Sequence, residues 1–144
     1  MTLDRGRAAK ACFPAAGTGG AICGLQFLAI TGGFTGTNAS LASVLTWGLI
    51  VFWVSWLVAS VAFLIGLHAV GISSVALLER RRQATPLTVA IQGSLLSGAV
   101  AGTFGAIAGG AYGATTSATF LLLPGASAGL VFHLAASQRG ASRP

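Results

Sequence analysis

Charged side chains are scarce in this 144-residue sequence and are confined to three short stretches. The eight Lys or Arg and two Asp or Glu residues all lie within 4–10, 79–82 and 139–143. The tracts between them, 11–78 and 83–138, contain no charged residue. A water-soluble domain needs charge over its whole surface. With a mean hydropathy of +0.84, this absence excludes an ordinary soluble domain and predicts an integral membrane protein.

Side chains suited to catalysis, ion transport or metal binding are also few. Proton- or cation-coupled transport usually places an acidic residue within the membrane, but Asp4 and Glu79 both lie at the edges of the apolar tracts. Cys12 and Cys23 are eleven residues apart, hence about 16 Å apart on one helix and beyond the roughly 7 Å limit for a disulfide. We therefore expect no catalytic residue, metal site, cofactor or disulfide, and a protein that is not an enzyme.

The length of the two tracts predicts the number of membrane crossings. A helix needs about 20 apolar residues to cross a bilayer, and its backbone groups must be satisfied internally. Each tract accommodates two such helices. We predict an all-α, integral membrane four-helix bundle that forms a single domain over residues 1–144. Its four spans lie at 11–31, 44–67, 87–111 and 117–136, with a basic loop at 79–86, an uncharged connection at 112–116 and a tail at 137–144.

The basic residues predict the orientation. With four crossings, both termini and the middle connection lie on one side, and these three places hold all eight Lys and Arg residues. Cationic loops stay in the cytoplasm during insertion, so both termini are expected there. The Ala- and Gly-rich composition, with Arg preferred over Lys, points to a bacterial inner membrane. A cleaved signal peptide is an alternative for the first tract, but its glycines interrupt the apolar run.

The second span raises a problem of length. Residues 44–78 would form a helix of about 52 Å, whereas about 26 residues suffice for a span tilted by 40°. One interpretation is a bend near Gly66, with 69–78 lying in the cytoplasmic interface. The other is a single long tilted helix whose last turns project into the cytoplasm. In both, anionic headgroups would contact basic anchors at Arg80, Arg81 and Arg82.

Small residues predict how the helices pack. Burial of apolar side chains drives helix association only weakly in lipid, so close contact between small residues must do so. We expect the third span at the centre, contacted by the first and fourth, with the Trp-rich second span beside them or facing lipid. The partner of these small residues lies either in this chain or in another subunit. The predicted packing residues are Gly20, Gly24, Ser94, Gly98, Gly102, Gly105, Gly109, Gly125 and Gly129.

Three polar side chains fall near the cytoplasmic side. Gln92 and His133 lie about 9 Å from that edge, and His68 lies near the same level if the second helix bends. They either converge in a polar vestibule, where histidine would titrate near neutral pH, or separately contact headgroups and helix ends. Gln26, about 22 Å along the first helix, is expected to form an interhelical hydrogen bond.

Two functions of different class remain open. The first is a non-enzymatic subunit, accessory or assembly protein that acts through helix–helix contacts. The second is a small transporter or channel formed by a parallel oligomer with a pathway along the glycine-rich helices. The expected partners are the lipid bilayer, anionic headgroups, and another membrane protein or a second copy. Nucleic acid is not expected despite the net charge of +6, because no aromatic residues interleave the basic clusters.

Overall fold

Nearly all of the residues that the structure describes are helical. The computed structural model describes residues 5–31 and 40–137, in which no strand occurs, and the all-α prediction is confirmed. Asp4, most of the first connection and the basic cluster at 139–143 lie outside the described residues. The elements are α1 (Arg5–Thr31), α2 (Leu41–Gly66), the π-helical turn η2 (Leu67–Gly71), α3 (Ile72–Arg80) and α4 (Pro86–Ser137).

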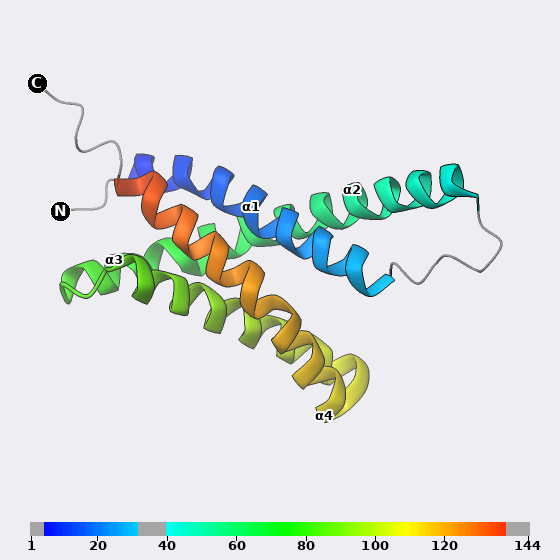
Figure 1. Cartoon of the computed structure of the whole chain (residues 1–144). Helices are drawn as coiled ribbons and strands as arrows, with labels where there is room; N and C mark the ends of the chain where they lie inside the picture. The colour runs from blue at the N-terminus through cyan, green and yellow to red at the C-terminus, as the bar shows by residue number, and fades with distance from the viewer. Residues whose placement is uncertain (1–4, 32–39, 138–144) are drawn as a thin grey trace, which may run out of the picture.

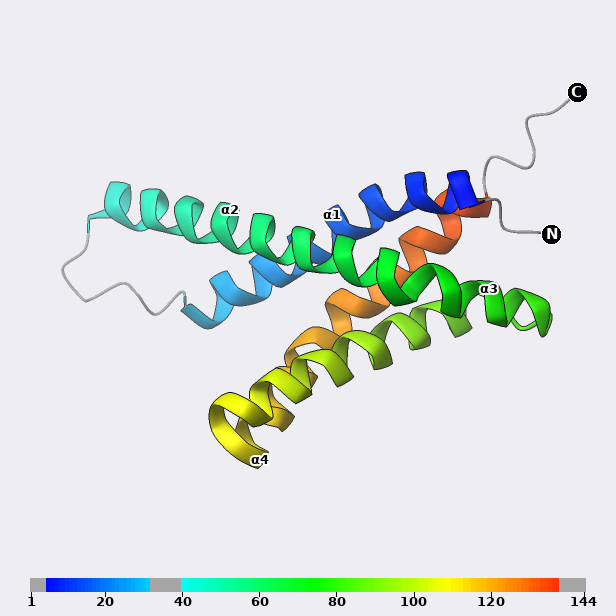
Figure 2. The same cartoon turned by 180° about the vertical axis from the view of Figure 1, so that it is seen from behind.

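The helix α4 folds back on itself. It contains 52 residues, and its backbone leaves the helical region at Gly109 (φ −145°, ψ 21°) and Gly110 (φ 61°, ψ −148°). Figures 1 and 2 show two antiparallel arms on either side of this reversal. We call 86–108 the first arm and 111–137 the return arm. Two glycines are enough for the reversal, because Gly110 adopts a backbone conformation that is essentially restricted to glycine. The connection predicted at 112–116 is therefore helical instead.

The second long helix does not break. Gly66 keeps helical dihedral angles (φ −61°, ψ −43°), and η2 joins α2 to α3 directly. A π-helical turn is wider than an α-helical turn and locally displaces the hydrogen-bond ladder. The path from Leu41 to Arg80 is thus a single 40-residue helical rod, with its irregular turn where the sequence predicts a bend. The placement of 69–78 in a membrane interface stays a prediction.

The central element is α1. It packs along both α2 and α4, whereas α2 and α4 scarcely meet. In Figures 1 and 2, α2 and the α4 hairpin diverge from each other with distance from α3. The third span was expected at the centre. The first takes that place because its small residues serve two faces: a Cβ at Gly19 would lie 3.1 Å from both Phe63 of α2 and Ala128 of the return arm.

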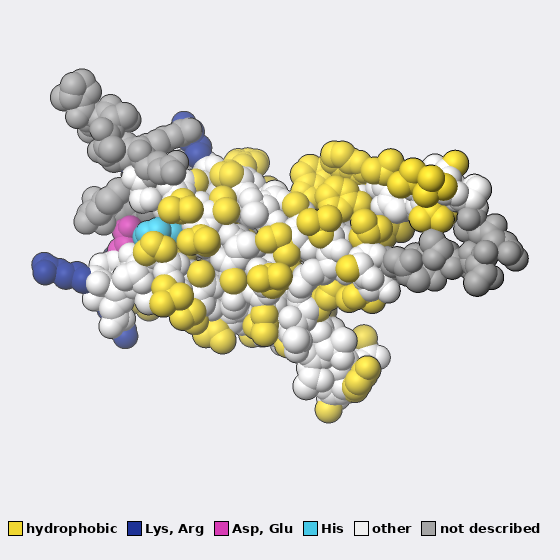
Figure 3. All heavy atoms as spheres, viewed as in Figure 1, with side chains coloured by type: hydrophobic (Ala, Val, Ile, Leu, Met, Phe, Trp, Pro, Cys, Tyr) yellow, Lys and Arg dark blue, Asp and Glu magenta, His cyan; other side chains and the backbone are white. Residues whose placement is uncertain are grey.

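The core lies at the α3 end of the molecule. There the alanine-rich start of α1 meets α3 and both arms of α4. Phe132 is the largest fully buried side chain. The described basic side chains gather at this same end, and apolar side chains cover much of the remaining surface in the view of Figure 3. The buried cluster comprises Ala8, Ala11, Cys12, Ala15, Val75, Val89, Phe132 and Ala136.

Candidate functional site

The closest helix contact of the protein is inside the α4 hairpin. A Cβ at Gly105 would collide with the backbone of Gly113, and a Cβ at Gly113 with that of Gly105. Further along, a Cβ at Gly93 would collide with the carbonyl group of Gly125. Facing residues are equidistant from Gly109, so the arms are in strict antiparallel register. The facing pairs are Gly105 with Gly113, Ser97 with Leu121, Gly93 with Gly125, and Val89 with Gly129.

Two serines of the first arm bind backbone carbonyls of the return arm. Ser97 Oγ donates to the Leu121 oxygen at 2.8 Å, and Ser94 Oγ donates to the Leu122 oxygen at 2.9 Å. Both carbonyls lie just before the buried Pro124. Proline removes the helical hydrogen bond to the carbonyl four residues earlier, here that of Phe120. The two serine bonds go to the next two carbonyls and join the arms beside this gap. We call these two bonds the serine clasp.

The row of small residues in closest contact differs from the predicted one. The predicted row runs through Ser94, Gly98, Gly102, Gly105 and Gly109. Gly105 lies in the closest contact, and a Cβ at Gly98 would lie 3.1 Å from the Leu122 side chain, but one at Gly102 would meet nothing closer than 3.4 Å. The closest backbone contacts follow a second row at Gly93, Ser97, Ala101 and Gly105. Gly93 was not predicted, although small residues recur at every fourth position along that row as well.

Gly109 was predicted to take part in packing and does not. No atom lies within 4 Å of a Cβ placed there, and the residue is exposed. The chain reverses at this point, which carries Gly109 away from both arms. The return-arm glycines Gly125 and Gly129 lie close to the first arm: a Cβ at Gly129 would lie 2.5 Å from the Val89 oxygen, and one at Gly125 would lie 2.5 Å from the Gly93 oxygen.

The contact between α1 and α2 uses the predicted glycines of α1. A Cβ at Gly20 would lie 2.8 Å from the Trp56 oxygen, and one at Gly24 would lie 3.2 Å from the Phe52 oxygen. The indole of Trp56 donates from Nε1 to the Gly17 oxygen at 3.1 Å. This interhelical bond was not foreseen. Gln26 was expected to form one, but its buried Oε1 has no partner in the described part of the chain.

No hydrogen bond among the described residues connects His68, Gln92 and His133. His68 is exposed, and its Nδ1 lies 2.9 Å from the Leu64 oxygen one turn earlier in the same helix. Gln92 Oε1 is buried without a partner in the described ranges, and His133 is half-buried. His68 thus bonds within its own helix, which tests neither of the two interpretations. A shared vestibule stays a prediction.

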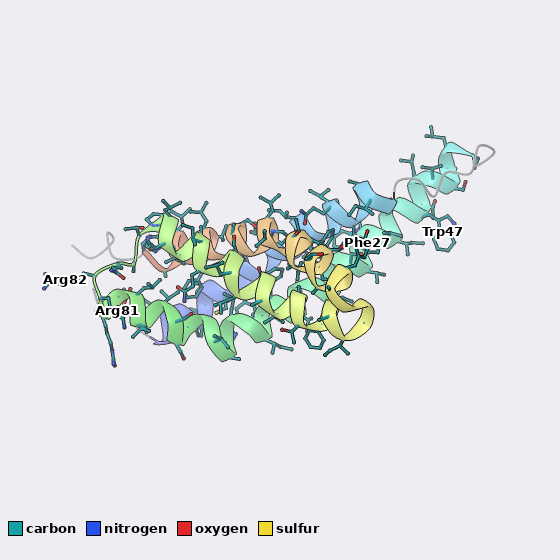
Figure 4. All side chains as sticks on the ribbon, turned by 90° about the horizontal axis from the view of Figure 1, so that it is seen from below. Phe27, Trp47, Arg81 and Arg82 are labelled. Carbon is teal, nitrogen blue, oxygen red and sulfur yellow. The ribbon has the colours of Figure 1, made fainter. Side chains whose placement is uncertain are left out.

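The basic anchors lie in the turn between α3 and α4. Arg80, Arg81 and Arg82 are all exposed there, and Figure 4 shows Arg81 and Arg82 extending outward from this turn. Over residues 5–31 and 40–137, no three His, Cys, Asp or Glu side chains are grouped as metal ligands would be. The described side chains can donate hydrogen bonds between helices. Their guanidinium groups are exposed at the α3 end of the molecule.

Comparison with protein-family models, with curated proteins and with solved structures finds no match to this chain. Function is therefore inferred from the geometry alone. Its three main features are the serine clasp inside the α4 hairpin, the exposed apolar surface of α2, and the arginine-containing turn after α3.

Proposed function

We propose that this chain is a non-enzymatic subunit or accessory protein of a bacterial inner membrane, and that it binds a transmembrane helix of another protein through α2. It crosses the membrane four times, with both termini in the cytoplasm. Three described helices are long and apolar enough to span a bilayer, which supports this topology. The return of α4 at Gly109 and Gly110 supplies the additional crossing.

The observation that carries the binding proposal is the exposure of α2. None of its 26 residues is buried, although its stretch is the most apolar of the three candidate spans. Trp53 is 56 % exposed, and Leu57 and Val61 are 59 % and 52 % exposed. In a membrane, such a surface contacts either lipid or another helix. The aromatic residue at its middle favours a helix.

Trp53 lies about 18 Å from the first residue of α2, near the middle of the proposed span. Its ring packs edge-to-face on Trp56, with centroids 5.1 Å apart, but its Nε1 has no hydrogen-bond acceptor within the part of the chain that the structure describes. Indole N–H groups usually find a partner when they are away from water, and lipid tails offer none. A partner helix that presents a carbonyl or hydroxyl oxygen would satisfy this donor.

Cysteine accessibility tests the topology. In a variant without Cys12 and Cys23, single cysteines replace Arg81, Ser142 or Ala42 in turn. A membrane-impermeant thiol reagent added to intact cells should label the cysteine at position 42 alone. Labelling the positions 81 and 142 from opposite sides of the membrane would refute the four-span arrangement.

Photo-crosslinking in native membranes tests the binding surface. A photoreactive amino acid replaces Trp53 in one variant and Val100, a 57 % exposed residue of the first arm, in a control. Capture of a different protein from position 53, and not from position 100, would support the proposal. Capture of a second copy would favour the oligomeric transporter or channel instead. Adducts with lipid alone from both positions would contradict binding through α2.

A further inference from the structure

The turn between α3 and α4 contains an unusual backbone conformation at Arg82. Its φ is 56°, and among the described residues it is the only non-glycine residue with positive φ. The left-handed region is disfavoured for L-residues because Cβ approaches the following carbonyl oxygen. Arginine lacks the short polar side chain that lets Asn or Asp occupy this region more readily. The conformation therefore opposes folding locally.

The hydrogen bonds of this turn explain why the conformation is needed. The Arg82 nitrogen donates to the Glu79 oxygen at 2.9 Å, and the Gln83 nitrogen donates to the Leu78 oxygen at 2.9 Å. These two bonds form a Schellman motif, which ends a helix with a left-handed residue that is usually glycine. The chain has 21 glycines, yet the position that most favours one holds arginine. Strained backbone conformations are concentrated at functional sites. The strain at position 82 therefore indicates that the Arg82 guanidinium group has a function.

Hydrogen bonds at the start of α4 fix the other end of the turn. The Thr88 nitrogen donates to Thr85 Oγ1 at 3.2 Å, the Thr85 nitrogen to Thr88 Oγ1 at 2.9 Å, and Thr88 Oγ1 to the Gln83 oxygen at 2.5 Å. Each helix end is therefore capped. The backbone of Arg82 is therefore held between two capped helix ends.

The directions of the arginines indicate the kind of ligand. Figure 4 shows Arg81 and Arg82 pointing away from the helices and away from each other. Two diverging guanidinium groups do not close on a single phosphate ion. They suit a layer of separate phosphates, each of which one arginine can bind in a bidentate manner. Apolar residues flank the turn on both sides: Leu77 is 52 % exposed and Leu87 is 68 % exposed, as expected at the edge of a hydrocarbon layer.

We infer that Arg82, together with Arg81, binds the phosphate groups of anionic phospholipids in the cytoplasmic leaflet, and that this contact is the reason arginine occupies the left-handed position. The inference rests on the proposed membrane insertion. Each basic residue near an anionic leaflet strengthens binding by an energy equivalent to about fivefold. Glycine at position 82 would keep the Schellman motif, and Arg80 and Arg81 would remain as topology signals.

The experiment compares the wild type with Arg82→Gly and Arg82→Lys, as full chains in phosphatidylcholine bicelles titrated with phosphatidylglycerol. Thermal unfolding in phosphatidylcholine alone reports the backbone strain, and the rise in midpoint with phosphatidylglycerol reports binding. We expect Arg82→Gly to be more stable without anionic lipid and to bind phosphatidylglycerol about fivefold more weakly. Arg82→Lys keeps the charge and the left-handed residue but cannot bind a phosphate in a bidentate manner. It should match the wild type in phosphatidylcholine alone, and its phosphatidylglycerol binding should lie between those of the wild type and Arg82→Gly.

Two results would overturn the inference. One is unchanged phosphatidylglycerol binding in Arg82→Gly, and the other is no gain in its stability without anionic lipid. Inorganic phosphate at equal concentration should not raise the midpoint, and a rise equal to that with lipid would assign a free-anion site instead. Quenching of tryptophan fluorescence by lipids brominated on their acyl chains tests insertion separately. Absent quenching would contradict the proposed function, whereas normal quenching with unchanged binding would contradict the headgroup contact alone.

Discussion

Ser97 of the first arm donates a hydrogen bond of 2.8 Å from its Oγ to the backbone oxygen of Leu121 in the return arm. The same hydroxyl group also lies 3.0 Å from the Ser94 oxygen in its own arm, so one proton is shared between the two arms. Leu121 follows Phe120, whose carbonyl loses its helical partner at Pro124. The serine side chain of one arm thus joins the two arms beside the weakened turn.

Replacing this serine should therefore loosen the hairpin. We expect Ser97→Ala to lower the free energy of unfolding by about 1 kcal/mol, within the range found for side-chain hydrogen bonds between membrane helices. Titration with denaturing detergent, followed by circular dichroism, measures the change. Ser127→Ala is the matched control, because Ser127 is also half-buried but donates only to the Pro124 oxygen within its own arm. Equal losses in both variants would show that the clasp adds nothing between arms.

The two rows of small residues in the first arm should respond differently to an added methyl group. Gly93→Ala would drive Cβ against the Gly125 carbonyl and to 3.2 Å from Gly129 Cα. Backbone cannot move aside as a side chain does, so we expect a loss of roughly 1–3 kcal/mol. Gly102→Ala should be neutral or slightly stabilising, because its Cβ fits in ordinary contact. Detergent stability of the two purified variants decides, and a greater loss for Gly102→Ala would reject the register described here.

Gly109 and Gly110, at the reversal of α4, should also respond differently to replacement by alanine. Gly110 has φ 61° and ψ −148°, a region open to essentially no other residue, so Gly110→Ala should cost about 1–3 kcal/mol. Gly109→Ala should be tolerated, since φ is −145° and no atom lies within 4 Å of its Cβ. Thermal unfolding and protease accessibility of the reversal provide the measurement. Comparable behaviour of the two variants would mean that the turn has another geometry.

The two central tryptophans of α2 are predicted to serve different contacts. Trp56→Phe removes the bond from Nε1 to the Gly17 oxygen and should destabilise the chain by about 1 kcal/mol. Trp53→Phe should leave stability unchanged in detergent, while it weakens capture of the partner protein from a neighbouring crosslinking position. Unfolding titrations and crosslinking yields measure the two effects. Loss of stability in Trp53→Phe alone would reverse the assignment.

The helical class of the protein could be predicted because long uncharged tracts leave the backbone no other partner than itself. The spacing of Gly20 and Gly24 could predict that both lie on one helix face, but not that this face meets α2, because the first span was expected against the third. Gly93 was missed because the first arm carries two overlapping rows of small residues. Gly109 was misplaced because the sequence does not reveal where a glycine-rich helix turns back. From the sequence, Trp56 cannot be distinguished from a tryptophan that faces lipid. Only the structure shows that it donates a hydrogen bond to the Gly17 oxygen.

The distribution of charge by itself determined that this chain forms long apolar helices with its described basic residues at helix ends and in a turn, since hydropathy and internal hydrogen bonding are properties of local sequence. The tertiary structure alone decided that α1 is central, that the arms of α4 meet in register about Gly109, and that Arg82 adopts a left-handed backbone. Each of these features depends on which helix surfaces pack together and how closely. That packing involves residues that are far apart in the sequence, so a local sequence pattern does not predict it.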